Sequence, residues 1–267
     1  MPSLRLSELH IYPIKSARGI SLSSARVDLR GLEHDRRWMV VDEQGIFLTQ
    51  RSIPRMALIG VELGSTHLVV TAEGMNELGV PLRPESGDSL RVYVWDDSFD
   101  AMDVGPEAAA WFTKMLSRPC RLVYMSDDTE RLVNPKYSPE KSVVSFADAF
   151  PFMLISQASL NDLNTRLVEP VPMNRFRPNL VLEGCDPYEE DTWASLRIGT
   201  VGFRVAKPCS RCTVPTVNQE TGIRASEPIL TLGSYRTTGG KIYFGQNLTH
   251  AAQGILTVGD EVHATRA

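Results

Sequence analysis

The sequence predicts an α+β fold that is predominantly β, arranged as two β-rich lobes with a few helices. Short apolar and β-branched runs recur along the whole chain, and Gly, Pro, Ser or Asp separates each from the next. Only a few segments place their apolar residues at helical spacing. A polar segment with two prolines, residues 127–141, is the best candidate for a linker or mobile loop between the lobes.

The first half of the chain reads as strands joined by turns. Residues 4–11 alternate apolar and polar side chains with one change of phase, and Pro13 ends the run. Residues 37–41 and 45–49 predict a hairpin, because Gly45 offers the positive φ that a tight turn needs. Further strands are predicted at residues 61–63, 68–71, 90–95 and 120–125.

Three helices are predicted. Pro106 suits the first turn of a helix over residues 106–116, and the alanines at 108–110 favour it. Ser156 is a suitable N-cap for a helix over residues 157–167, and a short helix is expected at 227–235. The remaining strands are predicted at residues 152–155, 179–182, 196–198, 202–206 and 255–262.

Composition narrows the classes of function. The net charge of −4 gives no reason to expect a nucleic-acid partner, so any bound anion must be held by a local cluster of cations. No apolar run approaches the roughly 20 residues of a membrane-spanning helix, and residues 1–6 lack the features of a signal peptide. We therefore expect a cytoplasmic protein without a membrane partner.

The segment Lys207–Thr213 contains a Cys-x-x-Cys pair, Cys209 and Cys212, and four interpretations of it are open. A structural zinc site requires a second pair of ligands, which the spacing of the other cysteines and histidines does not supply. A thioredoxin-like redox pair requires a βαβ context. The pair can also be two buried apolar residues. Finally, Lys207 and Arg211 favour a thiolate, and one thiolate can bind a metal whose other ligands belong to a cofactor.

Three basic elements lie far apart in the sequence. Lys15 and Ser16 follow the first strand, where an ammonium, a hydroxyl and a turn amide suit a phosphate. Arg36 follows Asp35, and a structural ion pair between them is the alternative. Arg177 has the planar fork that binds phosphate in bidentate fashion, although it can equally be a surface arginine.

Two further segments are candidates for contact with a ligand. Asp148 lies in the aromatic segment Phe146–Pro151 and either binds substrate or caps a turn. Residues Phe244–Asn247 supply a glycine, an aromatic ring and two amides, which suits a loop that faces a ligand; a β-bulge or a turn is the alternative.

Taken in order, these elements resemble the MOSC-domain proteins with an N-terminal β-barrel domain, and among them the amidoxime-reducing components. The matching segments spread over nearly the whole chain and are residues 12–16, 35–38, 148–151, 174–179, 209–212 and 244–246. The resemblance implies two β-barrel-like lobes, with the N-terminal domain at residues 1–122 and the MOSC domain at residues 123–267.

The resemblance also implies a molybdenum cofactor, Mo-molybdopterin, held between the lobes with Cys212 as the catalytic metal ligand. The cofactor-binding residues are then expected to be Lys15, Ser16, Arg36, Arg177, Ser210, Arg211 and Asn247. Asp148 is the second catalytic candidate. Folding would gather these dispersed cations around one phosphate.

The implied activity is the reduction of N-hydroxylated small molecules such as amidoximes and N-hydroxylated bases. The sequence has no Gly-x-Gly-x-x-Gly dinucleotide site and too few cysteines near one another for an iron–sulfur cluster, so we expect a separate electron-donor protein, a flavin reductase or a ferredoxin. The alternative is a carrier of sulfur or of the molybdenum cofactor that uses Cys212.

Overall fold

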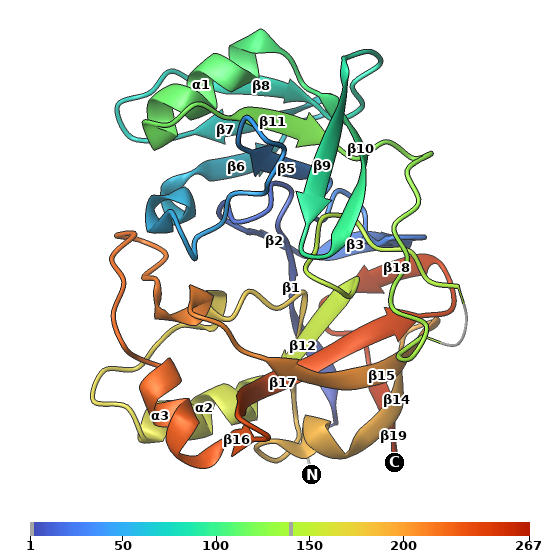
Figure 1. The fold of residues 1–267 in the computed structure, drawn as a ribbon. Helices are drawn as coiled ribbons and strands as arrows, with labels where there is room; N and C mark the ends of the chain where they lie inside the picture. The colour runs from blue at the N-terminus through green and yellow to red at the C-terminus, as the bar shows by residue number, and fades with distance from the viewer. Residues whose placement is uncertain (1–2, 139–140) are drawn as a thin grey trace.

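The computed structural model describes residues 3–138 and 141–267 and contains two lobes, which Figure 1 shows one above the other. The first lobe comprises residues 38–124 and carries the helix α1 (Pro106–Leu116). The second lobe is built on a nine-stranded sheet and carries α2 (Gln157–Thr165) and α3 (Ile229–Tyr235). The prediction of a predominantly β fold with few helices is confirmed.

Two sheets form most of the first lobe. One has the order β5-β11-β10-β9 and the other the order β6-β7-β8. Their strands are β5 (Trp38–Val41), β6 (Gly60–Leu63), β7 (His67–Thr71), β8 (Leu78–Pro81), β9 (Ser89–Val94), β10 (Asp97–Asp103) and β11 (Arg121–Tyr124).

The nine-stranded sheet of the second lobe has the order β19-β14-β15-β17-β12-β13-β1-β2, with β16 added beside β17. Its pairs are antiparallel except β12 with β13, which run in parallel. Its strands are β1 (Arg5–Ile11), β2 (Ile20–Leu22), β12 (Phe152–Ser156), β13 (Leu180–Glu183), β14 (Trp193–Ile198), β15 (Val201–Ser210), β16 (Thr237–Thr238), β17 (Lys241–His250) and β19 (Val262–Arg266). A separate three-stranded sheet joins β3 (Ser24–Asp28), β4 (Gly31–Leu32) and β18 (Gly254–Thr257).

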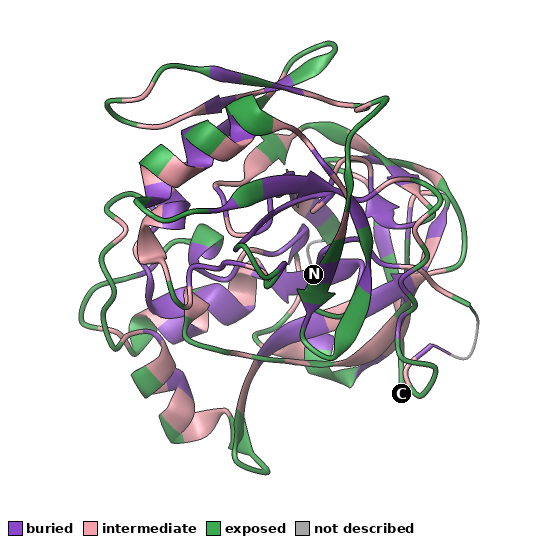
Figure 2. Ribbon diagram, turned by 45° about the horizontal axis from the view of Figure 1, so that its top comes forward, coloured by how far each residue is buried: buried purple, intermediate pink, exposed green. Residues whose placement is uncertain are grey.

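The central strands are continuously apolar because both faces of the sheets are covered. In β12, Phe152 and Leu154 pack into one hydrophobic cluster, whereas Met153 and Ile155 pack into another on the opposite face. Alternate side chains of a strand point to opposite faces, so each strand contributes to two cores. Figure 2 shows these strands as buried and the outer edges of the helices as exposed.

Strand pairing crosses the expected domain boundary in several places, and the boundary itself falls inside β11. Strand β1 pairs with β13, where Arg5 is opposite Glu183, and β3 pairs with β18. The division of the chain at residues 122 and 123 itself stays a prediction. Of the candidate linker, residues 127–138 and 141 carry no helix or regular strand, and Arg131 ties the segment down with a hydrogen bond to the Ser145 carbonyl of 2.9 Å; residues 139 and 140 lie outside the described residues.

The interpretation of residues 244–247 as a loop is wrong, because they lie inside strand β17. The register between β15 and β17 shifts between Pro208 and Ser210, which is the bulge that was the alternative. Gly245 has φ +81°, and a Cβ there would lie 2.6 Å from the Leu154 carbonyl oxygen, so only glycine fits. The polar pair that follows Gly245 is typical of a turn, which explains the misassignment.

Two predicted boundaries differ slightly from the observed ones. Ser156 is the N-cap of α2, with its hydroxyl accepting from the Ser159 amide at 3.1 Å, and the helix ends at Thr165, two residues early. The hairpin turn at Gly45 is present, but only β5 on its first side is a regular strand. In the part of the chain that the structure describes, no helix is long and apolar enough to cross a membrane.

Candidate functional site

A cavity of about 160 Å³ lies between the two lobes, and all nine residues that the sequence predicted for the site line it. They come from six segments: the turn after β1, the residue pair before β5, the loop before β12, the residues before β13, the end of β15 with its continuation, and β17. The lining residues among the predictions are Lys15, Ser16, Arg36, Asp148, Arg177, Ser210, Arg211, Cys212 and Asn247. The roles given to these residues stay predictions.

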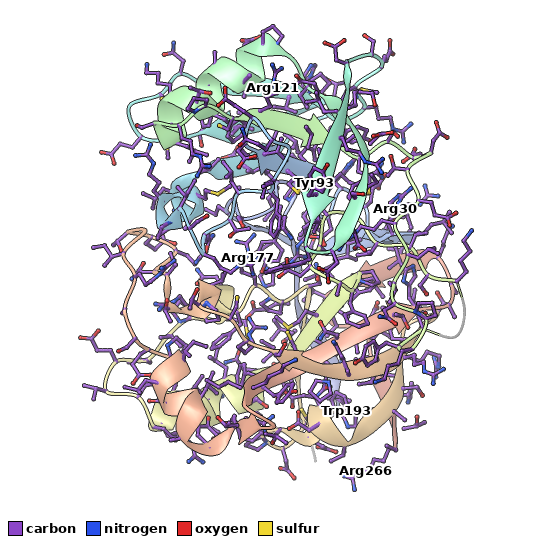
Figure 3. All side chains as sticks on the ribbon, in the orientation of Figure 1. Arg30, Tyr93, Arg121, Arg177, Trp193 and Arg266 are labelled. Atoms are coloured by element: carbon purple, nitrogen blue, oxygen red, sulfur yellow. The ribbon has the colours of Figure 1, made fainter. Side chains whose placement is uncertain are left out.

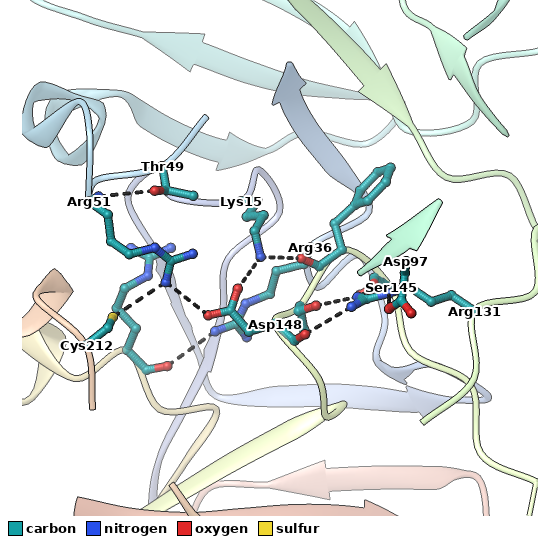
Figure 4. Close-up of polar contacts among 12 residues, drawn as sticks. Lys15, Arg36, Thr49, Arg51, Asp97, Arg131, Ser145, Asp148 and Cys212 are labelled. Carbon is teal, nitrogen blue, oxygen red and sulfur yellow. Dashed lines mark hydrogen bonds and ion pairs between the residues drawn. The ribbon is translucent and has the colours of Figure 1, made fainter. Parts of the chain in front are cut away.

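Lys15 lines this cavity and lies in the turn that follows β1. Its amide donates to the Trp38 carbonyl at 2.8 Å, and its ammonium donates to the Phe146 carbonyl at 2.7 Å and to Asp148 Oδ1 at 2.6 Å (Figure 4). Burial lowers the pKa of Lys15 to about 8, although the neighbouring Asp148 carboxylate opposes the shift. Lys15 is therefore a cation whose charge can be lost in mildly alkaline solution.

Arg36 and Arg177 both lie over the ring of Tyr12, with guanidinium carbons 4.3 and 4.2 Å from the ring centroid. Arg36 is also fixed by hydrogen bonds to Asp35 at 2.6 Å and to the Asn179 side chain at 3.0 Å, so the ion pair considered from the sequence is present. Tyr12 is buried, and burial raises its pKa to about 12, so its hydroxyl keeps its proton and donates to a carbonyl.

Arg177 differs from Arg36 because it makes no ion pair with any residue that the structure describes. Figure 3 shows Arg177 at the boundary between the lobes. Burial lowers the pKa of Arg177 to about 10, which leaves it charged at neutral pH. A charged guanidinium that faces a cavity and has no carboxylate partner is suited to an anionic ligand.

Three residues of the cavity have backbone conformations that residues other than glycine rarely adopt: φ is 70° at Ser16, 50° at Arg36 and 57° at Arg177. Each such conformation costs of order 1–3 kcal/mol and persists where the surroundings impose it, often at binding sites. Here the three strained residues are also residues that we expect to bind the cofactor, so the backbone strain is concentrated in the lining of the cavity.

The two cysteines of the Cys-x-x-Cys pair have different surroundings. Cys209 is a half-buried residue of β15, and its sulfur accepts a hydrogen bond from Arg211 Nη1 at 3.1 Å. Cys212 is exposed after the strand ends, and its sulfur accepts from Arg51 Nη1 and from the Val214 amide, both at 3.5 Å. All four cysteines are free thiols; Cys209 and Cys212 both line the cavity, and of these two only Cys212 is exposed.

Arg51 is the main residue of the site that sequence reasoning missed. It lines the cavity, and the same nitrogen that faces the Cys212 sulfur also lies 3.4 Å from Asp148 Oδ2 (Figure 4). Nothing in the local sequence distinguishes it from other arginines; only its position just after the predicted hairpin hints that it faces the neighbouring lobe. Thr49, which also lines the cavity, was missed for the same reason.

Asp148 is ionised in this arrangement. Burial alone would raise its pKa, but Lys15 and Arg51 outweigh burial and hold the pKa of Asp148 well below its usual range. The carboxylate is therefore a hydrogen-bond acceptor at neutral pH and has no proton of its own to donate.

The donor set fits a cofactor that brings its own metal ligands. Among the described residues, no three His, Cys, Asp or Glu side chains come together as a metal site. A metal at Cys212 would therefore have one protein thiolate, and the cofactor would supply the rest. The cations around the cavity suit a phosphate, and Arg211 Nε is buried without a hydrogen-bond partner in the described structure.

Comparison with known proteins gives two matches to family models that together span most of the chain. Residues 3–119 match the MOSC N-terminal beta barrel domain, and residues 141–263 match the MOSC domain. The chain is 37% identical over 280 residues to mitochondrial amidoxime reducing component 2 of Rattus norvegicus, covering 97% of this chain and 82% of the relative. It is 34% identical over 277 residues to mitochondrial amidoxime-reducing component 1 of Homo sapiens, with the same coverage of 97% and 82%. Among solved structures, the YUAD protein of Bacillus subtilis aligns over 97% of this chain and 94% of that one, at 11% identity and a TM-score of 0.46.

Proposed function

The chain belongs to the family of proteins that join a MOSC N-terminal beta barrel domain to a MOSC domain, and from this membership we propose that it is a molybdenum-cofactor-dependent reductase of N-hydroxylated small molecules. The observation that carries the proposal is the position of the free, exposed thiol of Cys212 in a cavity lined with cations. The names of its relatives describe the reduction of amidoximes, which are the substrate class proposed for this chain.

The residues of the cavity divide into two groups in this proposal. Cys212 would hold the metal, while Arg36, Arg177 and Arg211 would hold the phosphate of the cofactor, with Lys15 and Ser16 beside them. Ser210 and Asn247 complete the lining from β15 and β17. When bound there, the cofactor would supply the two electrons of the reduction.

The overall reaction converts an N-hydroxylated compound, two electrons and two protons into the corresponding amine or amidine and water. Asp148 lies close to Arg51 and Lys15 and is ionised, so it would accept hydrogen bonds from the N–H and O–H groups of the substrate. Because the Asp148 carboxylate has no proton to give, the two protons must come from the solvent or from another group.

The proposal is tested by purifying the protein from a host that makes the molybdenum cofactor and measuring its molybdenum content and its reduction of benzamidoxime by reduced viologen dye. We expect near-stoichiometric molybdenum and dye-dependent formation of benzamidine. The exposed thiol of Cys212 also suits the alternative, a carrier of sulfur or of the cofactor. Protein that holds molybdenum without turnover, or that carries a cyanide-labile sulfur at Cys212, would favour the carrier over the reductase.

A further inference from the structure

We propose that Arg51 is a positioning residue of this site, which holds the Asp148 carboxylate and the Cys212 sulfur in a fixed arrangement across the boundary between the lobes. Its Nη1 nitrogen donates to Cys212 Sγ at 3.5 Å and to Asp148 Oδ2 at 3.4 Å. The inference rests on the proposed function, since it assigns Arg51 a role in the reaction of that same site.

The contacts form a continuous chain of hydrogen bonds and ion pairs along the cavity. Lys15 holds one oxygen of Asp148 at 2.6 Å and Arg51 holds the other, so the carboxylate cannot rotate without losing a cation. Arg51 then connects this carboxylate to the thiol of Cys212, as Figure 4 shows. Through Arg51, a residue of the first lobe, two groups of the second lobe are fixed relative to each other.

Two aromatic rings lie next to the Arg51 guanidinium. Its central carbon lies 4.4 Å from the ring centroid of Trp95 and 5.7 Å from that of Phe47, and these two rings contact each other edge to face. Only 20% of the Arg51 side chain is exposed to solvent. A guanidinium that lies over aromatic faces is attracted to them and loses conformational freedom before any ligand arrives.

The backbone around Arg51 is clamped by the segment that follows Cys212. Arg224 donates to the carbonyls of Gln50 and Arg51 at 2.9 and 2.6 Å. The buried side chains of Gln50 and Gln219 form a reciprocal amide pair, with N–O distances of 3.1 and 3.0 Å. The part of the chain that carries the thiol therefore also holds the arginine that faces it.

A role in positioning, and not in cofactor retention, follows from the partners that Arg51 already has. Arg177 makes no ion pair with any described residue, whereas Arg51 is paired with Asp148 and braced by Trp95. A catalytic arrangement gains rate when its groups are held in the productive geometry by residues that are themselves fixed. A hydrogen bond to a metal-binding sulfur also tunes the electronic properties of the metal.

The experiment compares Arg51→Gln, Arg51→Lys and Trp95→Leu with the wild type in molybdenum-loaded protein, and Arg91→Gln serves as the control. Arg91 is an exposed arginine of the same lobe that pairs with Asp100, so the control removes an equal charge away from the cavity. For each protein we measure molybdenum content, kcat and KM for benzamidoxime, and the paramagnetic resonance spectrum of the metal after partial reduction by dithionite.

We expect Arg51→Gln to keep its molybdenum, to lose about ten- to a hundredfold in kcat as one charge-assisted hydrogen-bond donor is removed, and to show an altered resonance spectrum. Arg51→Lys should recover part of kcat, Trp95→Leu should shift kcat in the same direction as Arg51→Gln, and Arg91→Gln should match the wild type. Loss of activity in proportion to molybdenum, or an unchanged kcat and spectrum, would overturn the inference. If Arg51→Gln does not fold, Arg51→Lys and Trp95→Leu decide by the same criteria. Wild-type protein that holds molybdenum without reducing amidoximes would refute the proposed function, whereas the spectra would still test Arg51.

Discussion

Cys209 and Cys212 are only three positions apart in the sequence, yet their side chains differ in exposure and in hydrogen-bond partners. Cys209 is a half-buried residue of β15 with Arg211 at its sulfur, whereas Cys212 is exposed beyond the end of the strand. Both cysteines line the cavity, and the exposed thiol of Cys212 is the more accessible of the two to a ligand there.

The first prediction compares Cys212→Ala with Cys209→Ala. The first change removes the soft anionic ligand, so turnover should be abolished while part of the cofactor stays bound through its phosphate. The second change replaces one small half-buried side chain by another and should leave turnover close to that of the wild type. Both are measured as benzamidoxime reduction per bound molybdenum; wild-type turnover in Cys212→Ala at equal occupancy would refute the assignment.

The second prediction concerns Arg177, whose guanidinium makes no ion pair with a described residue. A charge-assisted hydrogen bond to phosphate is worth roughly 1.5–3 kcal/mol, so Arg177→Ala should weaken cofactor binding about ten- to a hundredfold. The purified variant should contain less molybdenum but retain near-normal activity per metal. Arg166→Ala, in an exposed pair with Asp162, is the control and should keep full occupancy. Full occupancy of the Arg177 variant after extensive dialysis would contradict the assignment.

The third prediction follows from the depressed pKa of Lys15, which is about 8 in the cofactor-free protein. Lys15 carries its charge below this pH and loses it above, so the affinity of the cavity for an anion should be constant below about pH 8 and fall as the pH rises through it. The limiting slope is about tenfold per pH unit. Titration calorimetry of the cofactor-free protein with sulfate, whose charge does not change in this pH range, measures this slope. Lys15→Arg stays charged and should show a flat profile; identical slopes in both proteins would exclude Lys15 as the cause.

Most of the site could be predicted from the sequence because its residues occur in short motifs that, taken in order, resemble those of the MOSC-domain proteins; the chemistry of each motif alone left alternatives open. The thiol, Lys15 and Arg177 each belong to such a motif, and all of them line the cavity. Arg51 could not be predicted, since its role depends on Asp148 and Cys212, which lie 97 and 161 positions away in the chain. Contacts of that range are set by the packing of the lobes, which a single sequence does not specify.

At the scale of elements, one residue of β17, Gly245, explains why residues 244–247 were assigned to a loop and not to a strand. Gly245 interrupts the apolar pattern, and its positive φ of 81° belongs to the bulged pairing of β15 with β17. That bulge changes the register at the end of β15, next to the residues that lead into Cys212. Analysis of apolar periodicity assigns such an interruption to a turn. Strands β2, β3 and β4 were missed because runs this short do not show a clear alternating pattern.

The fourth prediction is that Gly245→Ala destabilises the protein by at least about 1–3 kcal/mol, because the new Cβ would be strained at positive φ and would clash with the Leu154 carbonyl. Gly202→Ala is the matched control in the same sheet: no atom lies within 4 Å of its added Cβ. The control should change the free energy of unfolding by no more than about 0.5 kcal/mol. Urea denaturation measures the free energy of unfolding of both variants. Equal losses in the two would show that neither positive φ nor lack of space requires glycine at position 245.

At the scale of the whole molecule, the two lobes line a shared cavity, and the described residues offer no cluster of ligands for a metal centre of the protein's own. Apart from Cys212, three cysteines remain, and no cluster of three metal-binding side chains occurs in residues 3–138 and 141–267. We propose that electrons come from a separate flavin reductase or ferredoxin that docks only transiently, as weak redox encounters do. Both the donor and a cytoplasmic location stay predictions.

The fifth prediction is that the molybdenum-loaded chain does not oxidise NADH or NADPH by itself in the presence of an amidoxime. Turnover should appear only with reduced viologen dye or with an added donor protein, because a nicotinamide binding motif is absent from the sequence. Nicotinamide absorbance at 340 nm and product formation are followed together. Rapid nicotinamide oxidation by the chain alone would contradict the prediction.

The pairing of β1 with β13 has a consequence for how the chain is made. Strand β1 leaves the ribosome early, but its neighbour in the sheet, in which Glu183 is opposite Arg5, is translated much later. At about 5–20 residues per second, β1 waits roughly ten to thirty-five seconds for this partner. During that interval the edge of β1 that β13 later covers exposes unpaired backbone groups, which can pair with another nascent chain. Slow translation or a crowded polysome should therefore lower the yield of folded protein, and pairing through the exposed edge of β1 should be the first cause of the loss.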